Sequence, residues 1–211
     1  MWLTMVNPVD IDVSGGIYIT TPEVSESSAE VEVMATLVNS GINNENIVLR
    51  TELFDPSGKL AGTASSNSSM TPGQTIEVIQ NIPIKKPALW SIEAPNLYNA
   101  RVSVLINEQV VDNDETPFGV RSVKIDAQKG LSINDKTLEL IGGCYHHDNG
   151  PLGAASIDRA EERKIEVLKK TGFNAIRTSH NPPSPALLDA CDRLGMVVMD
   201  EIFDTRDHRS F

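Results

Sequence analysis

The spacing of apolar residues changes once along this chain, near Gly119, and that change limits the folds it can adopt. Before Gly119, apolar and polar residues alternate over short segments such as residues 29–39, a spacing typical of half-buried strands. After it, short apolar runs alternate with helix-length segments that have one apolar face. We therefore expect an all-β domain followed by a domain of mixed strands and helices.

Turn signals divide the first part into short strands. We expect strands over residues 29–39, 48–54, 74–84, 98–106 and 109–111. Asp55-Pro56-Ser57-Gly58 predicts a turn, because proline fixes φ and glycine accepts a positive φ, and Asn107-Glu108 predicts another. About seven strands in about 110 residues, without a helical pattern, are typical of an immunoglobulin-like β-sandwich.

Strands and helices alternate in the second part. Apolar runs at residues 138–141, 173–176 and 196–199 predict three strands, with one amphipathic helix in each interval. In a strand–helix–strand unit the helix carries the chain back to the end of the sheet where the first strand began, so we expect the three strands to be parallel. Their nearly uniform apolar character fits strands that are covered on both faces.

Each of the two helices has its own start signal. Asp158 is the expected N-cap of the first helix, with Glu161 three residues later as its capping-box partner. Ser184 is the expected N-cap of the second helix, and Pro185 is its expected first helical residue. Gly195 follows this helix and suits a left-handed cap.

Polar residues gather directly after all three strands of the second part. The clusters are His146-His147-Asp148, Arg177-Thr178-Ser179-His180 and Asp200-Glu201. Because (β/α)₈ barrel enzymes build their sites at the carboxyl ends of the strands, the three clusters predict an active face. A metal-dependent barrel hydrolase is an alternative. Its usual first ligand pair is His-x-His, with both imidazoles on one face, whereas this chain has adjacent histidines.

These segments resemble those of the family 2 glycoside hydrolases of the β-galactosidase/β-glucuronidase kind. Residues 174–182, NAIRTSHNP, are similar to the family signature N-A-I-R-T-S-H-x-P. Residues 142–148 resemble its glycine-led stretch with a His-x-Asp or His-Glu end, and residues 188–201 resemble its segment around barrel strand three. Leu89-Trp90-Ser91 with Pro95-Asn96-Leu97-Tyr98 resembles its late-sandwich motif L-W-S…P-x-L-Y. The resemblance covers essentially the whole chain.

The resemblance implies a jelly-roll sugar-binding domain, an immunoglobulin-like domain and a (β/α)₈ catalytic barrel, in that order. Residues 1–6 would then be the last strand of the jelly roll, 7–121 the sandwich, and 122–211 the first three barrel strands. The family mechanism is retaining hydrolysis by two glutamates about 5 Å apart. Both are expected beyond residue 211, so the isolated chain is expected to be inactive. Asn44-Glu45 and Asn107-Glu108 lie in sandwich turns and are not candidates.

The resemblance also gives roles to the strand-end residues. His146 and His180 match histidines that contact the sugar, and Arg177 matches the arginine that orients the nucleophilic carboxylate. Asp200 and Glu201 would form the pocket floor or tie neighbouring strands together. In the alternative interpretation, Arg177 is only an ion-pair partner of one of these carboxylates, and His180 is only a loop residue. The expected substrate-binding or supporting set is His146, Asp148, Arg177, His180, Asn181, Asp200 and Glu201.

Charge and composition limit the partners. The formal net charge is -11, and an acidic surface repels nucleic acid and anionic membranes. No run approaches the roughly 20 apolar residues of a membrane span. We expect a parent enzyme that acts on terminal β-D-galactosides, with glucuronides or mannosides as alternatives, and neither a cofactor nor a metal is expected. A non-catalytic carbohydrate-binding or scaffolding module is the alternative function.

Three strands cannot close a barrel, so their open edges predict a homo-oligomer, or loose order after about residue 125. Residues 204–209 are expected to be solvated. Of the two cysteines, Cys191 falls on the apolar face of the second helix, and we expect both thiols to be reduced. The N-terminus does not read as a signal peptide, and both a periplasmic and a cytoplasmic location stay open.

Overall fold

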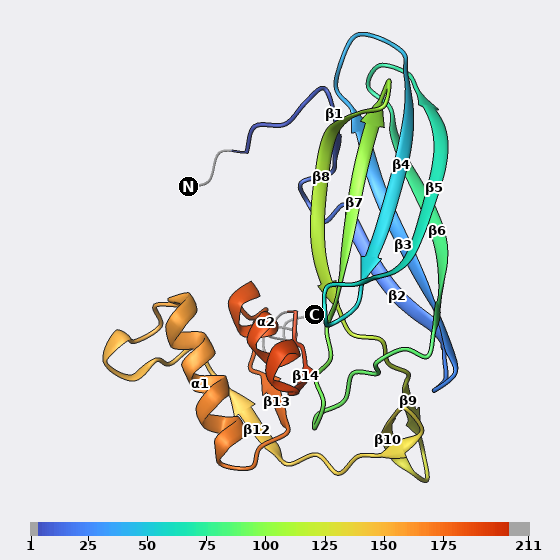
Figure 1. Cartoon of the computed structure of the whole chain (residues 1–211). Helices are drawn as coiled ribbons and strands as arrows, with labels where there is room; N and C mark the ends of the chain where they lie inside the picture. Colours follow the sequence, from blue (N-terminus) through green and yellow to red (C-terminus); the bar gives the residue numbers. More distant parts are fainter. Residues whose placement is uncertain (1–3, 203–211) are drawn as a thin grey trace, which may run out of the picture. The chain divides into compact units, whose positions relative to one another are not determined.

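The structure is a computed structural model that describes residues 4–202 (Figure 1). These residues form two compact units: 4–89 with 97–122, and 90–96 with 123–202. No helix among them is long and apolar enough to cross a membrane. The predicted fold class, an immunoglobulin-like sandwich followed by the start of an α/β barrel, is confirmed.

The first unit is a sandwich of two four-stranded antiparallel sheets, drawn from blue to green in Figure 1. One sheet consists of β1 (Val9–Ile11), β2 (Ile17–Val24), β3 (Ser28–Asn39) and β6 (Thr75–Lys85). In this sheet β3 pairs with each of the other three strands. The other sheet has the order β5-β4-β7-β8; its strands are β4 (Glu45–Phe54), β5 (Leu60–Met70), β7 (Tyr98–Ile106) and β8 (Gln109–Phe118).

The core of the sandwich follows from the period-two pattern. Every second residue of β3, from Ala29 to Leu37, is buried against the facing sheet, as the sequence predicted. The Asn107-Glu108 turn is also confirmed, since both residues have a positive φ, as a tight hairpin between right-twisted strands requires. The sequence did not predict β5, which is rich in serine and gives no apolar pattern; its backbone pairs with β4 along its length.

The second unit contains a small antiparallel sheet and a parallel one. The antiparallel sheet, order β11-β10-β9, was not predicted; its strands are β9 (Val123–Asp126), β10 (Gly130–Ile133) and β11 (Lys136–Thr137). The parallel sheet, order β12-β13-β14, confirms the predicted direction; its strands are β12 (Gly142–Tyr145), β13 (Ala175–Thr178) and β14 (Val197–Met199). A short 3₁₀ helix, η1 (Gly150–Leu152), follows β12, and α1 (Asp158–Lys170) and α2 (Pro185–Leu194) are the two longer helices.

Two local predictions in this unit are wrong. The strand expected at residues 138–141 lies at Gly142–Tyr145, because Gly142 approaches β13 so closely that a Cβ atom there would collide with the Ala175 carbonyl oxygen. Asp158 is the first helical residue rather than the N-cap; Ile157 occupies that position without a side-chain cap. The second helix begins as predicted: the Ser184 hydroxyl accepts a hydrogen bond from the Leu187 amide at 3.3 Å.

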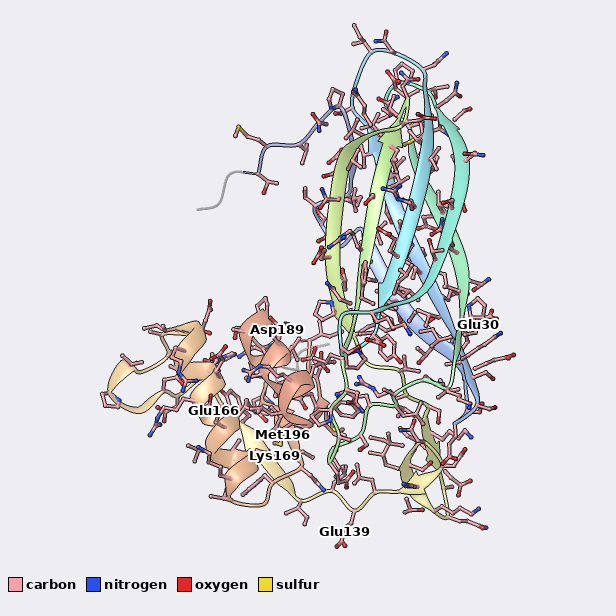
Figure 2. The ribbon with its side chains drawn as sticks, in the orientation of Figure 1. Glu30, Glu139, Glu166, Lys169, Asp189 and Met196 are labelled. Carbon is pink, nitrogen blue, oxygen red and sulfur yellow. The ribbon has the colours of Figure 1, made fainter. Side chains whose placement is uncertain are left out.

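Residues 90–96 belong to the second unit and bind the carboxyl ends of both helices. Trp90 is only 2% exposed, and its Nε1 donates a hydrogen bond to the Asp192 carbonyl oxygen at 2.8 Å. Lys169, labelled on α1 in Figure 2, donates to the carbonyl oxygens of Ile92 at 2.7 Å and Gly195 at 2.8 Å. Gly195 has φ +73°, and a Cβ there would lie 2.5 Å from the Ile92 oxygen, so both conformation and space require glycine. The tryptophan motif assigned to the sandwich by sequence thus supports the helical unit.

Candidate active site

The parallel sheet places the ends of its three strands side by side. Cys144 lies opposite Arg177 on β13, and Arg177 lies opposite Met199 on β14. Their neighbours Tyr145 and Ile176 pack in the core with the helices, so these three side chains project from the other face of the sheet. The polar segments that follow the strands therefore meet at one edge.

Arg177, His180 and Glu201 form a network at this edge. The Arg177 guanidinium donates from Nε to Glu201 Oε1 at 2.6 Å, and its Nη2 pairs with the same oxygen. The other carboxylate oxygen, Oε2, lies 3.2 Å from His180 Nδ1. All three side chains keep partial exposure, so the network is open to a ligand. The structure brings together two of the three predicted clusters through Glu201.

Thr178 fixes the position of the third strand's end and was not assigned a role from the sequence. Its side chain is buried, and its hydroxyl donates to Asp200 Oδ1 at 3.1 Å while accepting from the Glu201 amide at 2.9 Å. Asp200 is thus bonded to β13 rather than to Arg177. Successive side chains of a strand point to opposite faces of the sheet, so the sequence indicates that Thr178 points away from Arg177. No sequence pattern indicates the hydrogen-bond partners of Thr178.

The remaining predicted residues lie after β12 and β13. The His146 and His180 rings are 6.0 Å apart in an edge-to-face arrangement, which brings the first cluster to the network. His147 is half-buried, whereas His146 is exposed. The Asp148 carboxylate accepts a hydrogen bond from the Gly150 amide at 2.9 Å, so it shapes its own loop. Asn181 is exposed.

The two cysteines have opposite environments. Cys144 is exposed, and the Ser179 hydroxyl, together with the Arg177 guanidinium 3.4 Å from Sγ, lowers the pKa of its thiol. Hydrogen bonds to Cys144 and to Glu201 in turn raise the pKa of Arg177, which keeps its positive charge. Burial raises the pKa of Cys191 to about 12. Both cysteines are free, as predicted, and Cys191 lies in the core of the second unit.

The chemistry available at this edge is hydrogen bonding and charge, from one guanidinium, two imidazoles and two carboxylates. A polyhydroxylated ligand offers both donors and acceptors and suits such a surface. Within residues 4–202, no group of three or more histidine, cysteine, aspartate or glutamate side chains has the geometry of a metal site.

A β-sandwich followed by parallel strands with polar residues at their carboxyl ends is an arrangement that suits a modular barrel enzyme. The family model for glycosyl hydrolases family 2 matches residues 13–121, and the model for the TIM barrel domain of that family matches residues 123–208. The chain therefore belongs to glycosyl hydrolase family 2.

The similar proteins bear two different activity names. The chain is 41% identical over 204 residues to a β-galactosidase of Bacteroides ovatus, and this alignment covers 97% of this chain and 24% of that protein. It is 36% identical to a putative β-glucuronidase of Formosa agariphila, and that alignment covers 96% of this chain and 19% of that protein. Among solved structures, a family 2 member from Bacteroides cellulosilyticus superposes with a TM-score of 0.90 at 41% identity, covering 93% of this chain and 27% of that one. A Bacteroides uniformis β-glucuronidase superposes with a TM-score of 0.88 at 30% identity, covering 93% of this chain and 24% of that one. The chain spans about a quarter of these relatives.

Proposed function

We propose that this chain is part of a retaining exo-glycosidase that removes terminal β-D-galactosyl groups. The observation that carries the proposal is the Arg177–Glu201–His180 network at the carboxyl ends of three parallel strands. We place the acid/base and nucleophilic glutamates of the parent enzyme outside these 211 residues. The chain would then contribute one wall of the sugar site.

The residues of this wall have distinct tasks in the proposal. His146 and His180 offer ring nitrogens to sugar hydroxyls, whose hydrogen bonds strengthen as the sugar ring gains oxocarbenium character. Arg177, held by Glu201, presents its remaining donors to the nucleophilic carboxylate and favours the ionised form. Asp200 and Thr178 hold the end of β14 in place, so that Glu201 keeps its position.

A neutral galactoside is favoured over a glucuronide by the charges at this edge. A glucuronide carries a carboxylate, which binds best next to an uncompensated cation. Within the described residues the guanidinium of the network is Arg177, which is held by Glu201 and in this proposal faces the nucleophilic carboxylate, so it is not available to a carboxylate of the sugar. The name of the Bacteroides ovatus relative supports the same choice, whereas the Formosa agariphila and Bacteroides uniformis names support the alternative.

Hydrolysis of a panel of nitrophenyl β-glycosides tests this proposal. The panel contains the galactoside, glucuronide, mannoside and glucoside, and each is offered to the 211-residue chain and to a form extended to the length of its relatives. We expect the extended form alone to cleave, with the galactoside preferred.

Each outcome of the panel has a definite meaning. Preference for the glucuronide would contradict the galactoside assignment but keep the glycosidase. Cleavage by the 211-residue chain itself, after contaminants are excluded, would contradict the placement of the catalytic pair. An extended form that binds sugars and cleaves none would favour a carbohydrate-binding or scaffolding module.

A further inference from the structure

A second polar network lies behind β12, on the helix side of the sheet. Glu161 is 1% exposed, and its carboxylate accepts hydrogen bonds from the Tyr145 hydroxyl and from Asn149 Nδ2, the latter at 3.0 Å. Burial alone would raise the pKa of Glu161, but these hydrogen bonds and the charge of Lys164 together lower it, so the buried group stays ionised. The network joins α1 to the end of β12 and to the loop that follows it.

Lys164 makes the most direct connection from α1 to the predicted sugar site. Its Nζ lies 3.8 Å from the centre of the Tyr145 ring and donates hydrogen bonds to the carbonyl oxygens of His146 at 3.0 Å and Asp148 at 2.9 Å. The same His146 oxygen accepts the Asp148 amide at 2.8 Å, so one cation fixes both ends of this tight turn. The backbone that carries the His146 ring is therefore held from behind.

We propose that Lys164 is a positioning residue for His146. The ammonium group donates to the His146 and Asp148 carbonyls and holds the imidazole edge-to-face against His180. It lies over the Tyr145 ring, whose hydroxyl donates to Glu161. This inference rests on the proposed function, because it assigns His146 a sugar contact. Lys164 itself donates to backbone oxygens, and the proposal assigns it no contact with the sugar.

Kinetics of the extended form tests the proposal. Lys164→Met removes the ammonium group and keeps the aliphatic stem, Lys164→Arg keeps a cationic donor, and Lys170→Met removes an exposed lysine from the same helix as the matched control. We expect Lys164→Met to lower kcat/KM for the preferred glycoside by roughly 10- to 100-fold, since misplacing a substrate-facing group by about 1 Å has effects of this size. Lys164→Arg should recover most of the loss, and Lys170→Met should match the wild type.

Imidazole NMR spectra of the 211-residue chain give a readout that needs no activity. The chain has four histidines, so the His146 and His180 ring signals can be assigned by substitution. We expect Lys164→Met to shift the His146 signals and weaken the ring-to-ring contact with His180, while Lys164→Arg and Lys170→Met leave both in place. Lys164→Gln, which retains a neutral donor, replaces Lys164→Met if that variant does not fold.

The two measurements separate the two claims. An extended wild type that cleaves no glycoside contradicts the proposed function, while the His146 spectra still decide whether Lys164 positions the ring. A Lys164→Met variant with wild-type kcat/KM and unchanged His146 signals overturns the positioning role and leaves the proposed function standing. A loss that Lys164→Arg does not recover, accompanied by an equal loss of thermal stability, also overturns it.

Discussion

Glu161 and Glu201 are both carboxylates of the second unit, but their surroundings give them different tasks. Glu201 is partly exposed and shares its two oxygens between Arg177 and His180. Glu161 is buried and bonded to Tyr145, sixteen residues earlier in the chain. The sequence assigned Glu161 to a capping box because the spacing from Asp158 fits one. Spacing along a helix cannot reveal a partner on a neighbouring strand, so this role could not be predicted.

The ionised state of Glu161 predicts a pH dependence of stability. Its folded-state pKa is lowered, so the folded chain binds fewer protons at this site than the unfolded chain does. The contribution of Glu161 to the free energy of unfolding is fully present above the ordinary glutamate pKa of about 4.3, and it is lost as the pH falls through the lowered folded-state pKa. We expect Glu161→Gln to reduce the free energy of unfolding by roughly 1–3 kcal/mol at pH 7, as for hydrogen bonds to buried charged groups.

Denaturant unfolding of both proteins between pH 7 and pH 3 measures this dependence. The difference between wild type and Glu161→Gln should begin to shrink below the ordinary glutamate pKa of about 4.3, where the unfolded chain takes up the proton, and should vanish once the folded carboxylate is protonated as well. Glu162→Gln, on the partly exposed side of the same helix, serves as the control. A difference that stays constant across the range would contradict an ionised Glu161.

At the scale of the elements, where an apolar pattern predicted a strand or helix, it gave the type of the element better than its limits. The strand β12 consists of Gly142, Gly143, Cys144 and Tyr145, and no apolar pattern identifies it. Its glycines allow close approach to β13, a property that depends on the partner strand. The second helix was predicted correctly at both ends because Ser184, Pro185 and Gly195 act through their own backbone conformation. At α2 local signals were therefore sufficient, whereas the signal for β12 needs a neighbouring strand.

Residues 90–96 give a prediction at the same scale. Trp90→Ala removes a buried indole and its hydrogen bond to the Asp192 carbonyl, so it should destabilise the second unit by roughly 3–5 kcal/mol. Trp90→Phe should have a smaller effect because an aromatic ring remains. Hydrogen exchange of the α2 amides measures both, and Tyr18→Ala, which removes an exposed ring of the first unit, is the control. Unchanged protection of α2 in Trp90→Ala would show that residues 90–96 do not support the helices.

At the scale of the whole molecule, the sequence predicted a sandwich followed by parallel barrel strands, and family membership confirms both. The strand-end clusters were also predicted, because polar residues after apolar strands are visible without a structure. The connection of Arg177 to Glu201 rather than Asp200 was left open, since adjacent carboxylates cannot be distinguished by pattern. Within residues 4–202, β12 and β14 each pair only with β13, so the predicted homo-oligomer stays a prediction.

The central claim is that Arg177 serves a sugar site and is more than an ion-pair partner of Glu201. The most direct measurement compares kcat/KM and thermal unfolding of Arg177→Met with wild type in the extended form, with the exposed Arg159→Met as the control. We predict that kcat/KM falls by roughly 100-fold or more, as when one preorganised donor of an active site is removed, with little change in Tm. A lowered Tm with kcat/KM within about fivefold of wild type would contradict the claim and leave Arg177 as a structural residue.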